Sequence, residues 1–385
     1  MNHAFHRTGT RLSDRPAVLV AGGAGYIGSH GCRALLAAGY HPVAYDNLST
    51  GHRGFVTGSL VVGDLLDKGA LARAFAQYPV VAVMHFAASS LVGESVVDPR
   101  KYYLNNVAGT LSLLDAMREA GCNRLVFSST GAVYGNADSN ALPENYPCAP
   151  INPYGASKWM IERMLADYRS AYGLGAFCLR YFNASGADAS GGIGELRDNE
   201  THLIPRAMMA LQGHVADFAV FGDDYDTPDG TAIRDYIHVT DLATAHMLAL
   251  ELLIKGHTGG AFNLGTGTGF SVREILSAIA AETGRKVPHV VKPRRAGDPT
   301  YLVADPTGAP DPEIPACAFG PRDDHPDRLG MAPDGSSAQD RRATRSRRER
   351  DTGRTRYNGL ICTLRNLSTP EAYCSANGPL ACLLS

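Results

Sequence analysis

A tyrosine, a lysine and a threonine are the residues in this sequence whose types and spacing could do chemistry together. Tyr154 and Lys158 are four residues apart in a helix-compatible segment, Tyr154 to Tyr172, so they would share one helical face. An ammonium group beside a phenol stabilises the phenolate, so we expect Lys158 to lower the pKa of Tyr154 and make it a general base near neutral pH. Thr130 ends an apolar run about two dozen residues earlier. The alternative is that Tyr154 and Lys158 are only surface neighbours.

A glycine-rich turn could bind a dinucleotide. An apolar run at 17–21 is followed by Gly22, Gly23, Gly25 and Gly28 and then by a helix-compatible segment. Glycines let a diphosphate approach the N-terminus of that helix, where unpaired N–H groups favour negative charge. Asp46 follows the next apolar run and could accept hydrogen bonds from both hydroxyls of an adenine ribose. It would repel a 2′-phosphate, so the expected cofactor is NAD, and a turn without a ligand is the alternative.

Alternating strands and helices must position these residues. The expected strands are 17–21, 41–45, 60–64, 80–86 and 125–129, and the expected helices are 26–38, 68–77, 101–120 and 154–172. This alternation predicts an α/β fold with a Rossmann-type, doubly wound parallel sheet. Asp46, Asp64, Phe86 and Thr130 each follow a strand, and ligands gather at the carboxyl ends of strands in such sheets. Taken one at a time, each could be an ordinary turn residue.

The composition excludes several other classes of protein. The chain has 385 residues, 44% of them apolar, and a net charge of −2, which gives no indication of a nucleic-acid or membrane partner. The eight cysteines show no CxxC pair and no metal-ligand spacing, so we expect reduced thiols in a cytosolic protein and no metal. Residues 1–15 are polar and read as a disordered extension.

Seven motifs in order resemble one known family. They are GGAGYIG, HFAASSLVGES, SSTGAVYG, NPYGASK, LRYFNASGA, RDYIHVTDLA and RRAGDP, spread from about Ala17 to Asp305. Together they resemble the extended short-chain dehydrogenases/reductases, and within them the UDP-sugar 4-epimerases. The resemblance implies NAD-dependent interconversion of UDP-glucose and UDP-galactose through a 4-keto intermediate, in a homodimer. It leaves UDP-xylose, UDP-arabinose or UDP-N-acetylglucosamine as alternative substrates, and an NAD-sensing protein without turnover as an alternative function.

The resemblance also implies a role for each matching residue. Tyr154 is the base, Lys158 holds the cofactor ribose and Thr130 bonds the sugar hydroxyl. The other implied cofactor contacts are Gly22, Gly25, Tyr26, Ile27, Gly28, Asp46, Asn47, Leu48, Ser49, Thr50, Gly51, Asp64, Leu65, Phe86, Ala87, Ala88, Ser89, Ser90, Asn105 and Phe182. The implied UDP-sugar contacts are Asn183, His202, Leu203, Ala219, Val220, Phe221, Arg234, Arg295, Asp298 and Leu302. The arginines suit a diphosphate because guanidinium groups bind it as a fork; for Arg234 the alternative is an internal pair with Asp235.

Three positions depart from the family pattern. Ser90 stands where many of these enzymes have lysine, and His202 stands where others have asparagine. Leu302 occupies the position that gates the sugar pocket, where a small residue would admit an N-acetyl group, so the choice of sugar stays open.

The expected organisation has four parts. After residues 1–15 come an NAD-binding domain at 16–185 and a UDP-sugar-binding domain at 186–305, which returns in part to the first sheet. Residues 306–385 hold 11 arginines and no lysine, with little apolar periodicity. We interpret this last part as a disordered tail or as the product of a reading-frame shift near Gly308. With one choice of codons, a one-base shift across 324–333 gives Thr-Ile-Leu-Thr-Ala-Trp-Ala-Trp-His, an apolar helical segment.

Overall fold

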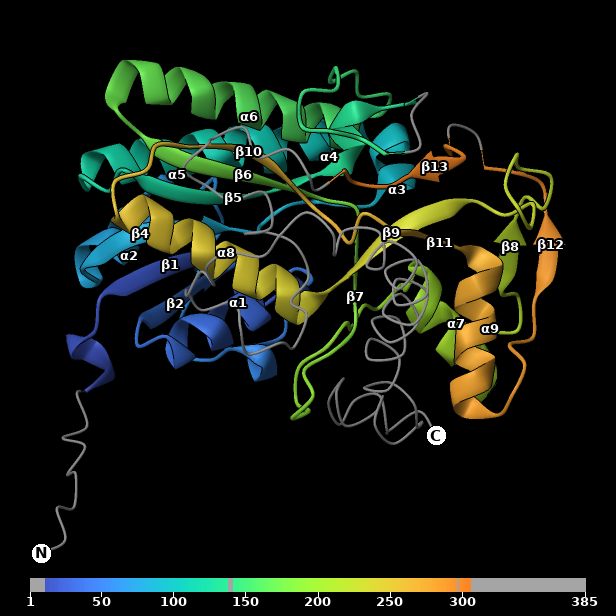
Figure 1. Cartoon of the computed structure of the whole chain (residues 1–385). Coiled ribbons are helices and arrows are strands. Elements are labelled where there is room, and N and C mark those ends of the chain that lie inside the picture. The colour runs from blue at the N-terminus through green and yellow to red at the C-terminus, as the bar shows by residue number, and fades with distance from the viewer. Residues whose placement is uncertain (1–10, 138–140, 296–297, 306–385) are drawn as a thin grey trace, which may run out of the picture.

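Strands and helices alternate along the computed structural model, which describes residues 11–137, 141–295 and 298–305 (Figure 1). The strands are β1 (Ala17–Ala21), β2 (His41–Asp46), β3 (Ser59–Val62), β4 (Val80–His85), β5 (Arg124–Thr130), β6 (Gly175–Tyr181), β7 (Asn183–Ser185), β8 (Ala219–Phe221), β9 (Ile233–His238), β10 (Gly259–Leu264), β11 (Gly269–Ser271), β12 (Val290–Lys292) and β13 (Tyr301–Leu302). The helices are α1 (Tyr26–Ala37), α2 (Lys68–Gln77), α3 (Val92–Val97), α4 (Pro99–Tyr102), α5 (Gly109–Glu119), α6 (Pro153–Tyr172), α7 (Leu203–Gln212), α8 (Val239–Ile254) and α9 (Val272–Thr283). Short turns of other helix types are η1 (Leu12–Asp14), η2 (Arg53–Phe55), η3 (Tyr103–Ala108) and η4 (Gly131–Tyr134).

The large sheet is parallel and has seven strands in the order β10-β6-β5-β4-β1-β2-β3. Helices α1 and α8 cover one face, and α2, α5 and α6 cover the other (Figure 1). Every residue of β1 is buried because both faces of the strand are covered, which is why its sequence is a continuous apolar run. The predicted α/β fold with a doubly wound sheet is therefore confirmed.

A smaller lobe follows the sixth strand of the large sheet. It contains a four-stranded sheet, in which β9 pairs with β7, β11 and β13, and a two-stranded sheet of β8 and β12. Helices α7 and α9 pack together in this lobe through side chains such as Ile204, Met208, Ile275 and Ile279 (Figure 1). Between these parts the chain returns to the large sheet, because α8 covers one of its faces and β10 forms its edge.

Apart from bounds that differ by one or two residues, two predictions of local structure differ from the structure. The helix expected over 101–120 is α4 and α5 with a turn of π-helix, η3, between them, and that wider turn directs the side chain of Asn106 into the interior. Apolar periodicity does not reveal such a local change of pitch. Leu12–Asp14 forms a 3₁₀ turn, so the prediction of disorder was wrong for these three residues. The expectations for residues 1–10 and 306–385 lie outside the described residues.

Candidate active site

The glycine turn is shaped mainly by contacts within the protein. Gly22 has a φ of +80°, and a Cβ there would lie 2.6 Å from the backbone nitrogen of Ala87. A Cβ on Gly28 would lie 2.1 Å from the carbonyl oxygen of Gly22, so glycine at 28 lets α1 approach the end of β1, whereas glycine at 22 makes room for the segment that follows β4. A Cβ on Gly25 would meet only that same oxygen, at 3.3 Å. Gly25 precedes α1, has no side-chain cap and is followed by a first turn without an acid, so it suits the approach of an anion.

Asp46 ends β2 beside this turn. Its carboxylate accepts hydrogen bonds from the backbone N–H groups of Ala24, at 2.9 Å, and Leu48, at 2.8 Å. Leu48 has a φ of 59°, in the left-handed region that is uncommon for leucine, so the loop 46–51 turns sharply around the carboxylate. Asn47 links this loop to the end of β3 by donating to Asp64 at 2.8 Å. The two predicted acids therefore lie on one continuous rim of the large sheet.

The loop 86–90 is fixed by a residue that the sequence did not single out. The side chain of Asn106 accepts from Ser89 N at 2.8 Å and donates to Ser89 O at 3.0 Å and to Ser157 Oγ at 3.0 Å. Asn106 is fully buried, whereas the predicted cofactor contact, Asn105, donates to it at 2.9 Å. A spacing argument selects either asparagine, and only the π-helical turn shows which one points inward.

Thr130, Tyr154 and Lys158 come together at the carboxyl end of β5. Thr130 is the last residue of that strand, and its hydroxyl caps η4 by accepting from Ala132 N at 3.1 Å. Tyr154 is the second residue of α6 and is hydrogen-bonded to the Thr130 hydroxyl. Lys158 lies one helical turn further and is 3% exposed, and its ammonium donates to Ser128 O at 2.8 Å. The structure therefore brings the three predicted residues together.

Their electrostatics differ from the prediction that Lys158 lowers the pKa of Tyr154. Burial raises the pKa of Tyr154, and the hydrogen bond with Thr130 and the positive charge of Arg197 oppose that effect without cancelling it. Burial also lowers the pKa of Lys158 to about 7, although the negative charge of Glu162 opposes this. The predicted lowering was therefore wrong for this structure, because both groups are removed from water and the lysine is directed at a backbone carbonyl.

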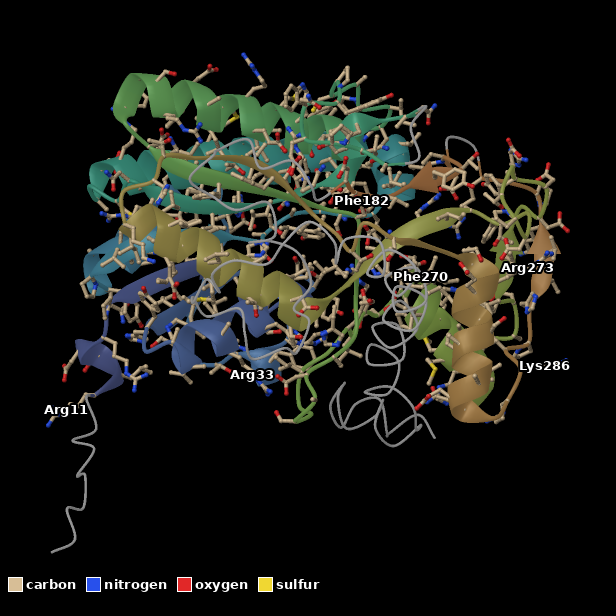
Figure 2. All side chains as sticks on the ribbon, viewed as in Figure 1. Arg11, Arg33, Phe182, Phe270, Arg273 and Lys286 are labelled. Carbon is tan, nitrogen blue, oxygen red and sulfur yellow. The ribbon has the colours of Figure 1, made fainter. Side chains whose placement is uncertain are left out.

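Two aromatic rings, those of Phe182 and Tyr134, form an aromatic wall near Thr130. Phe182 follows β6, and its ring stacks on that of Tyr134 with 6.5 Å between centroids. Figure 2 shows Phe182 between the large sheet and the smaller lobe, whereas Phe270 lies within the lobe. A Cβ on Gly131 would lie 2.6 Å from the ring of Phe182, so the glycine after Thr130 makes room for the wall. Leu302, the predicted gate, packs in the same apolar cluster as Phe182 and Tyr134.

The predicted UDP contacts line the smaller lobe. Arg234 is paired with Asp298 and not with Asp235, so the alternative of an internal pair with its neighbour does not hold. The guanidinium of Arg295 lies over the ring of Phe221, 3.9 Å from its centroid, at the end of β8. Asn183 donates to the carbonyl of Asp235 at 3.1 Å and so ties the start of β7 to β9.

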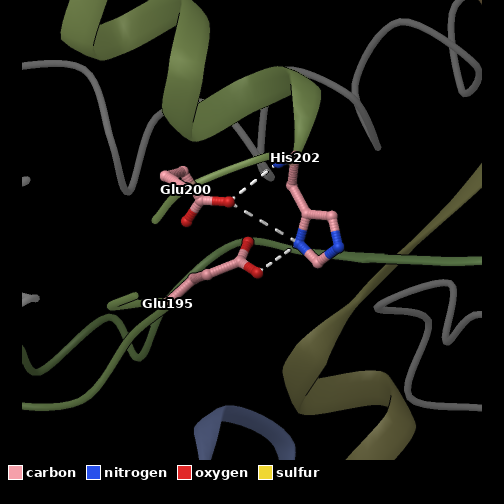
Figure 3. Close-up of side chains that lie close together, drawn as sticks. All are labelled: Glu195, Glu200 and His202. Atoms are coloured by element: carbon pink, nitrogen blue, oxygen red, sulfur yellow. Dashed lines mark hydrogen bonds and ion pairs between the residues drawn. The ribbon is translucent and has the colours of Figure 1, made fainter. Parts of the chain in front are cut away.

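His202 belongs to a charged cluster that the sequence did not predict. Figure 3 shows its imidazole beside the carboxylates of Glu195 and Glu200, at the start of α7. Nδ1 of His202 is hydrogen-bonded to Glu195, and the nearest oxygen of Glu200 lies 3.9 Å from that nitrogen. Arg197 donates to Glu195 at 3.1 Å. Both carboxylates are buried. Burial lowers the pKa of His202, but the charge of Glu195 and its hydrogen bond, together with the charge of Glu200, outweigh that effect, so the pKa is raised.

The same cluster connects the two halves of the site. His52, which follows the loop 46–51, is hydrogen-bonded to the carbonyl of Leu196 at 3.2 Å. Arg197 acts electrostatically on Tyr154. The segment 195–202 therefore links the loop at β2, the tyrosine and the helix of the smaller lobe. Among the described residues, no helix is both long and apolar enough to cross a membrane.

Comparison with known proteins identifies the family. Residues 18–265 match the NAD dependent epimerase/dehydratase family. The UDP-glucose 4-epimerase of Rhizobium meliloti (strain 1021) is 53% identical over 289 residues, which cover 75% of this chain and 88% of that protein. The enzyme of the same name from Azospirillum brasilense is 51% identical over 291 residues, 75% of this chain and 84% of that protein.

Solved structures agree with this match. The crystal structure of UDP-glucose 4-epimerase from Brucella ovis in complex with NAD is 57% identical, with a TM-score of 0.74, and the match covers 75% of this chain and 90% of that one. The structure of UDP-glucose-4-epimerase from Stenotrophomonas maltophila with bound NAD and formylated UDP-arabinopyranose is 41% identical, with a TM-score of 0.73 and the same coverage. The chain belongs to the NAD dependent epimerase/dehydratase family.

Proposed function

We propose that this protein is an NAD-dependent 4-epimerase that interconverts UDP-glucose and UDP-galactose through a 4-keto intermediate. One observation carries the proposal: a phenol hydrogen-bonded to a threonine, with a buried lysine one turn away, at the carboxyl end of a strand in a dinucleotide-type sheet. The names of the relatives support the choice of UDP-hexose as substrate, because they match this chain over nearly all of their own length.

The residues around the glycine turn fit NAD. The uncapped start of α1 at Gly25 offers backbone N–H groups to a diphosphate. Asp46 is 8% exposed, and each of its oxygens accepts one backbone hydrogen bond, which leaves lone pairs for ribose hydroxyls. The same charge disfavours the 2′-phosphate of NADP. Lys158, whose ammonium lies at the carboxyl end of β5, would hold the second ribose of NAD.

Tyr154 acts as the base in the proposed mechanism. It removes the proton of the sugar 4-hydroxyl, and Thr130 holds that hydroxyl in line with the phenol. NAD, when bound, supplies the acceptor that takes the hydride from C4 and returns it. Burial raises the pKa of Tyr154, so the phenol needs nearby positive charge to ionise. Arg197 provides part of that positive charge. The flat 4-keto sugar turns over in the pocket and accepts the hydride on its other face.

The smaller lobe holds the UDP group. Arg234 and Arg295 offer guanidinium groups to the diphosphate, and the ring of Phe221 offers a flat face to the uracil. Arg234 must exchange its bond with Asp298 for the phosphate, or share it, and Arg295 must leave the face of Phe221. The sugar then extends toward Phe182 and Leu302, which belong to one apolar cluster.

The intermediate size of Leu302 leaves related UDP-sugars as alternative substrates. Leu302 is smaller than an aromatic residue and larger than glycine, so 4-epimerisation of UDP-xylose, UDP-arabinose or UDP-N-acetylglucosamine is the second candidate. Similar solved structures include "The structure of the UDP-Glc/GlcNAc 4-epimerase from the human pathogen Campylobacter jejuni", 38% identical with a TM-score of 0.68. We assign the hexose first because the relatives with 51–53% identity carry that name.

The test is incubation of the protein with UDP-galactose and, separately, with UDP-N-acetylgalactosamine, with both 4-epimers measured. We expect turnover of UDP-galactose and loss of about 100- to 10,000-fold in rate in Tyr154→Phe, because that variant has no base. NAD content and thermal stability of the variant should stay close to those of the parent. A Tyr154→Phe protein that turns over at the parent's rate contradicts the assignment of the base.

The homodimer and the compartment are also part of the proposal. Apolar side chains are exposed on neighbouring helical segments of the large domain: Val96, Val97, Leu104, Leu111 and Met160. We infer that a second copy covers them, with no nucleic acid or membrane involved. We also propose a cytoplasmic location, with which the free thiols of Cys32 and Cys178 are compatible.

A further inference from the structure

Two oppositely charged side chains are buried directly behind the tyrosine, lysine and threonine. The guanidinium of Arg180, on β6, forms a fork with the carboxylate of Glu162, on α6, with Nε 3.0 Å from Oε1 and Nη2 2.6 Å from Oε2. Each side chain is 4% exposed. A buried ion pair is seldom a net source of stability compared with apolar packing, and the proposed chemistry uses neither group directly. Neither stability nor the proposed chemistry therefore explains why this ion pair is buried beside the site.

The pair fixes the strand end that carries Thr130. Ser129 donates to Glu162 Oε1 at 2.5 Å and lies opposite Arg180 in the register of β5 and β6. On the other side of Thr130, Arg180 donates to the hydroxyl of Tyr134 at 2.9 Å, in η4. The residue before Thr130 and the turn after it are thus held by one ion pair. A shift of the pair would move the threonine hydroxyl relative to Tyr154.

The pair also acts on Lys158. Glu162 follows Lys158 by one turn of α6, so the two side chains lie on the same face. Removal of the ammonium from water lowers the pKa of Lys158, and the charge of Glu162 opposes that lowering. Of two other groups around the Lys158 ammonium, neither carries a negative charge that could take the place of Glu162. The pKa of His85 is lowered by burial to about 3, so it is neutral, and the ring of Phe127 lies 4.7 Å from Nζ.

We propose that Glu162, held by Arg180, is a positioning residue that keeps Lys158 charged and Thr130 in register with Tyr154. Arg180 supplies the counter-charge that a buried carboxylate needs, and its fork fixes the carboxylate between the helix and the two strands. The inference rests on the proposed function only in one respect, namely that Lys158 and Thr130 take part in turnover. The charge of Lys158 itself can be measured without substrate.

The test compares Glu162→Gln with Glu162→Asp. Glutamine keeps the length but loses the charge, and its amide nitrogen cannot accept the hydrogen bonds that one carboxylate oxygen accepts in the parent. Aspartate keeps the charge and shortens the side chain. The chain has six lysines, so ¹³C-lysine NMR can follow the titration of Lys158, assigned with Lys158→Met. We expect the titration midpoint of Lys158, near 7 in the parent, to fall by about one pH unit or more in Glu162→Gln and to stay near the parent's in Glu162→Asp.

A pH profile of turnover gives the second readout. The alkaline limit of activity should move to lower pH in Glu162→Gln by about the same amount as the NMR midpoint, and not in Glu162→Asp. Glu162→Gln leaves the charge of Arg180 unopposed, so the double variant Glu162→Gln/Arg180→Met, which removes both charges, should titrate between it and the parent. This variant also covers the case in which Glu162→Gln does not fold.

Failure of the inference about Lys158 and failure of the proposed function give different results. If the Lys158 midpoint is the same in Glu162→Gln and the parent, or moves equally in Glu162→Asp, the pair acts through packing and the inference is wrong. If the midpoint moves as expected but no UDP-sugar is turned over, the inference about Lys158 stands and the proposed function fails. The single tryptophan, Trp159, lies 5.9 Å from the guanidinium of Arg180, so its fluorescence checks that each variant keeps its fold.

Discussion

At the scale of single residues, we propose that Leu302 sets how much room the sugar has. It packs with Phe182 and Tyr134 beside the proposed base. Leu302→Gly should open space for an N-acetyl group and raise the ratio of kcat/KM for UDP-N-acetylgalactosamine over UDP-galactose by about 10-fold or more. Leu302→Ile keeps the volume and is the matched control. An unchanged ratio in the glycine variant would show that another residue sets the size of the pocket.

We propose that one residue, Asp46, also sets the choice between NAD and NADP. Asp46 stands at the end of β2 with its carboxylate beside the glycine turn. Asp46→Ala combined with Asn47→Arg should bind NADP far better than the parent does, because a repulsive charge is replaced by an attractive one. Asp64→Asn removes a carboxylate from the same rim without touching the 2′ position, so it should leave the preference for NAD intact. Equal affinity of the unmodified protein for both cofactors would contradict the assignment.

For single residues, the sequence predicted which side chains lie together but not how burial changes their pKa values. Tyr154, Lys158 and Thr130 were predicted from a four-residue spacing and a strand end, and the structure brings them together. The direction of the Tyr154 pKa was wrong, because burial depends on distant elements such as β4 and β6 that a local spacing does not describe. Glu162 was missed for the same reason: its partner Arg180 is 18 residues away along the chain.

At the scale of elements, the π-helical turn η3 separates two adjacent asparagines into different roles. Asn106 bonds both backbone groups of Ser89, so Asn106→Ala should leave them unpaired and lower the free energy of unfolding by about 1–3 kcal/mol. Asn105→Ala should weaken NAD binding with little effect on unfolding. Urea denaturation without NAD and titration with NAD measure the two effects. The opposite pattern would exchange the roles of the two residues.

The segment 195–202 makes stability depend on pH. The raised pKa of His202 means that its contribution is complete below about 6.5, the ordinary pKa of histidine, and is lost as the pH rises through the higher folded value. The charged groups that face His202 are Glu195, Glu200 and Arg197. Glu195→Gln should therefore lower the free energy of unfolding more at pH 6 than at pH 9. Urea titrations at both values check this, and an equal loss at both would mean that His202 is not the titrating group.

The sequence predicted strands β1 to β5 and helices α1, α2 and α6, because their apolar residues follow regular patterns. The bounds of β1 and α2 were predicted without error, since covered parallel strands are continuous apolar runs and a helix start is marked by its cap, here Asp67. The cluster around His202 was not predicted. Its members lie outside regular elements before α7, where neither apolar periodicity nor a known spacing applies.

At the scale of the whole molecule, the exposed apolar side chains predict an assembly. Leu111→Asp, on α5, should reduce the proposed homodimer to a monomer, because a charge in an apolar interface must lose its water. Light scattering after size-exclusion chromatography measures the mass. Val62→Asp is the control, because Val62 is exposed at the far edge of the sheet, on β3. If the parent is itself a monomer, this part of the proposal is wrong.

The unusual composition of residues 306–385 leads to a prediction about the coding DNA. The match to Rhizobium meliloti covers 88% of that protein but only 75% of this chain. We expect the codons that follow residue 300 to contain a one-base insertion or deletion relative to those of such relatives. Sequencing that stretch of DNA decides the question, and an uninterrupted in-frame read through codons 300 to 330 would rule the shift out.

The order of strands in the large sheet has a consequence for how the chain folds during synthesis. Strand β10 is the edge partner of β6, yet 77 residues of the chain, 182–258, separate them and include β7, α7, β8 and β9 of the smaller lobe. A nascent chain that ends before residue 264 therefore exposes β6 as an unpaired edge, which can pair with other chains. The contact also spans a large sequence separation, which slows folding. Release of truncated chains at this stage should favour aggregation, and chaperones would have to shield β6 until β10 emerges.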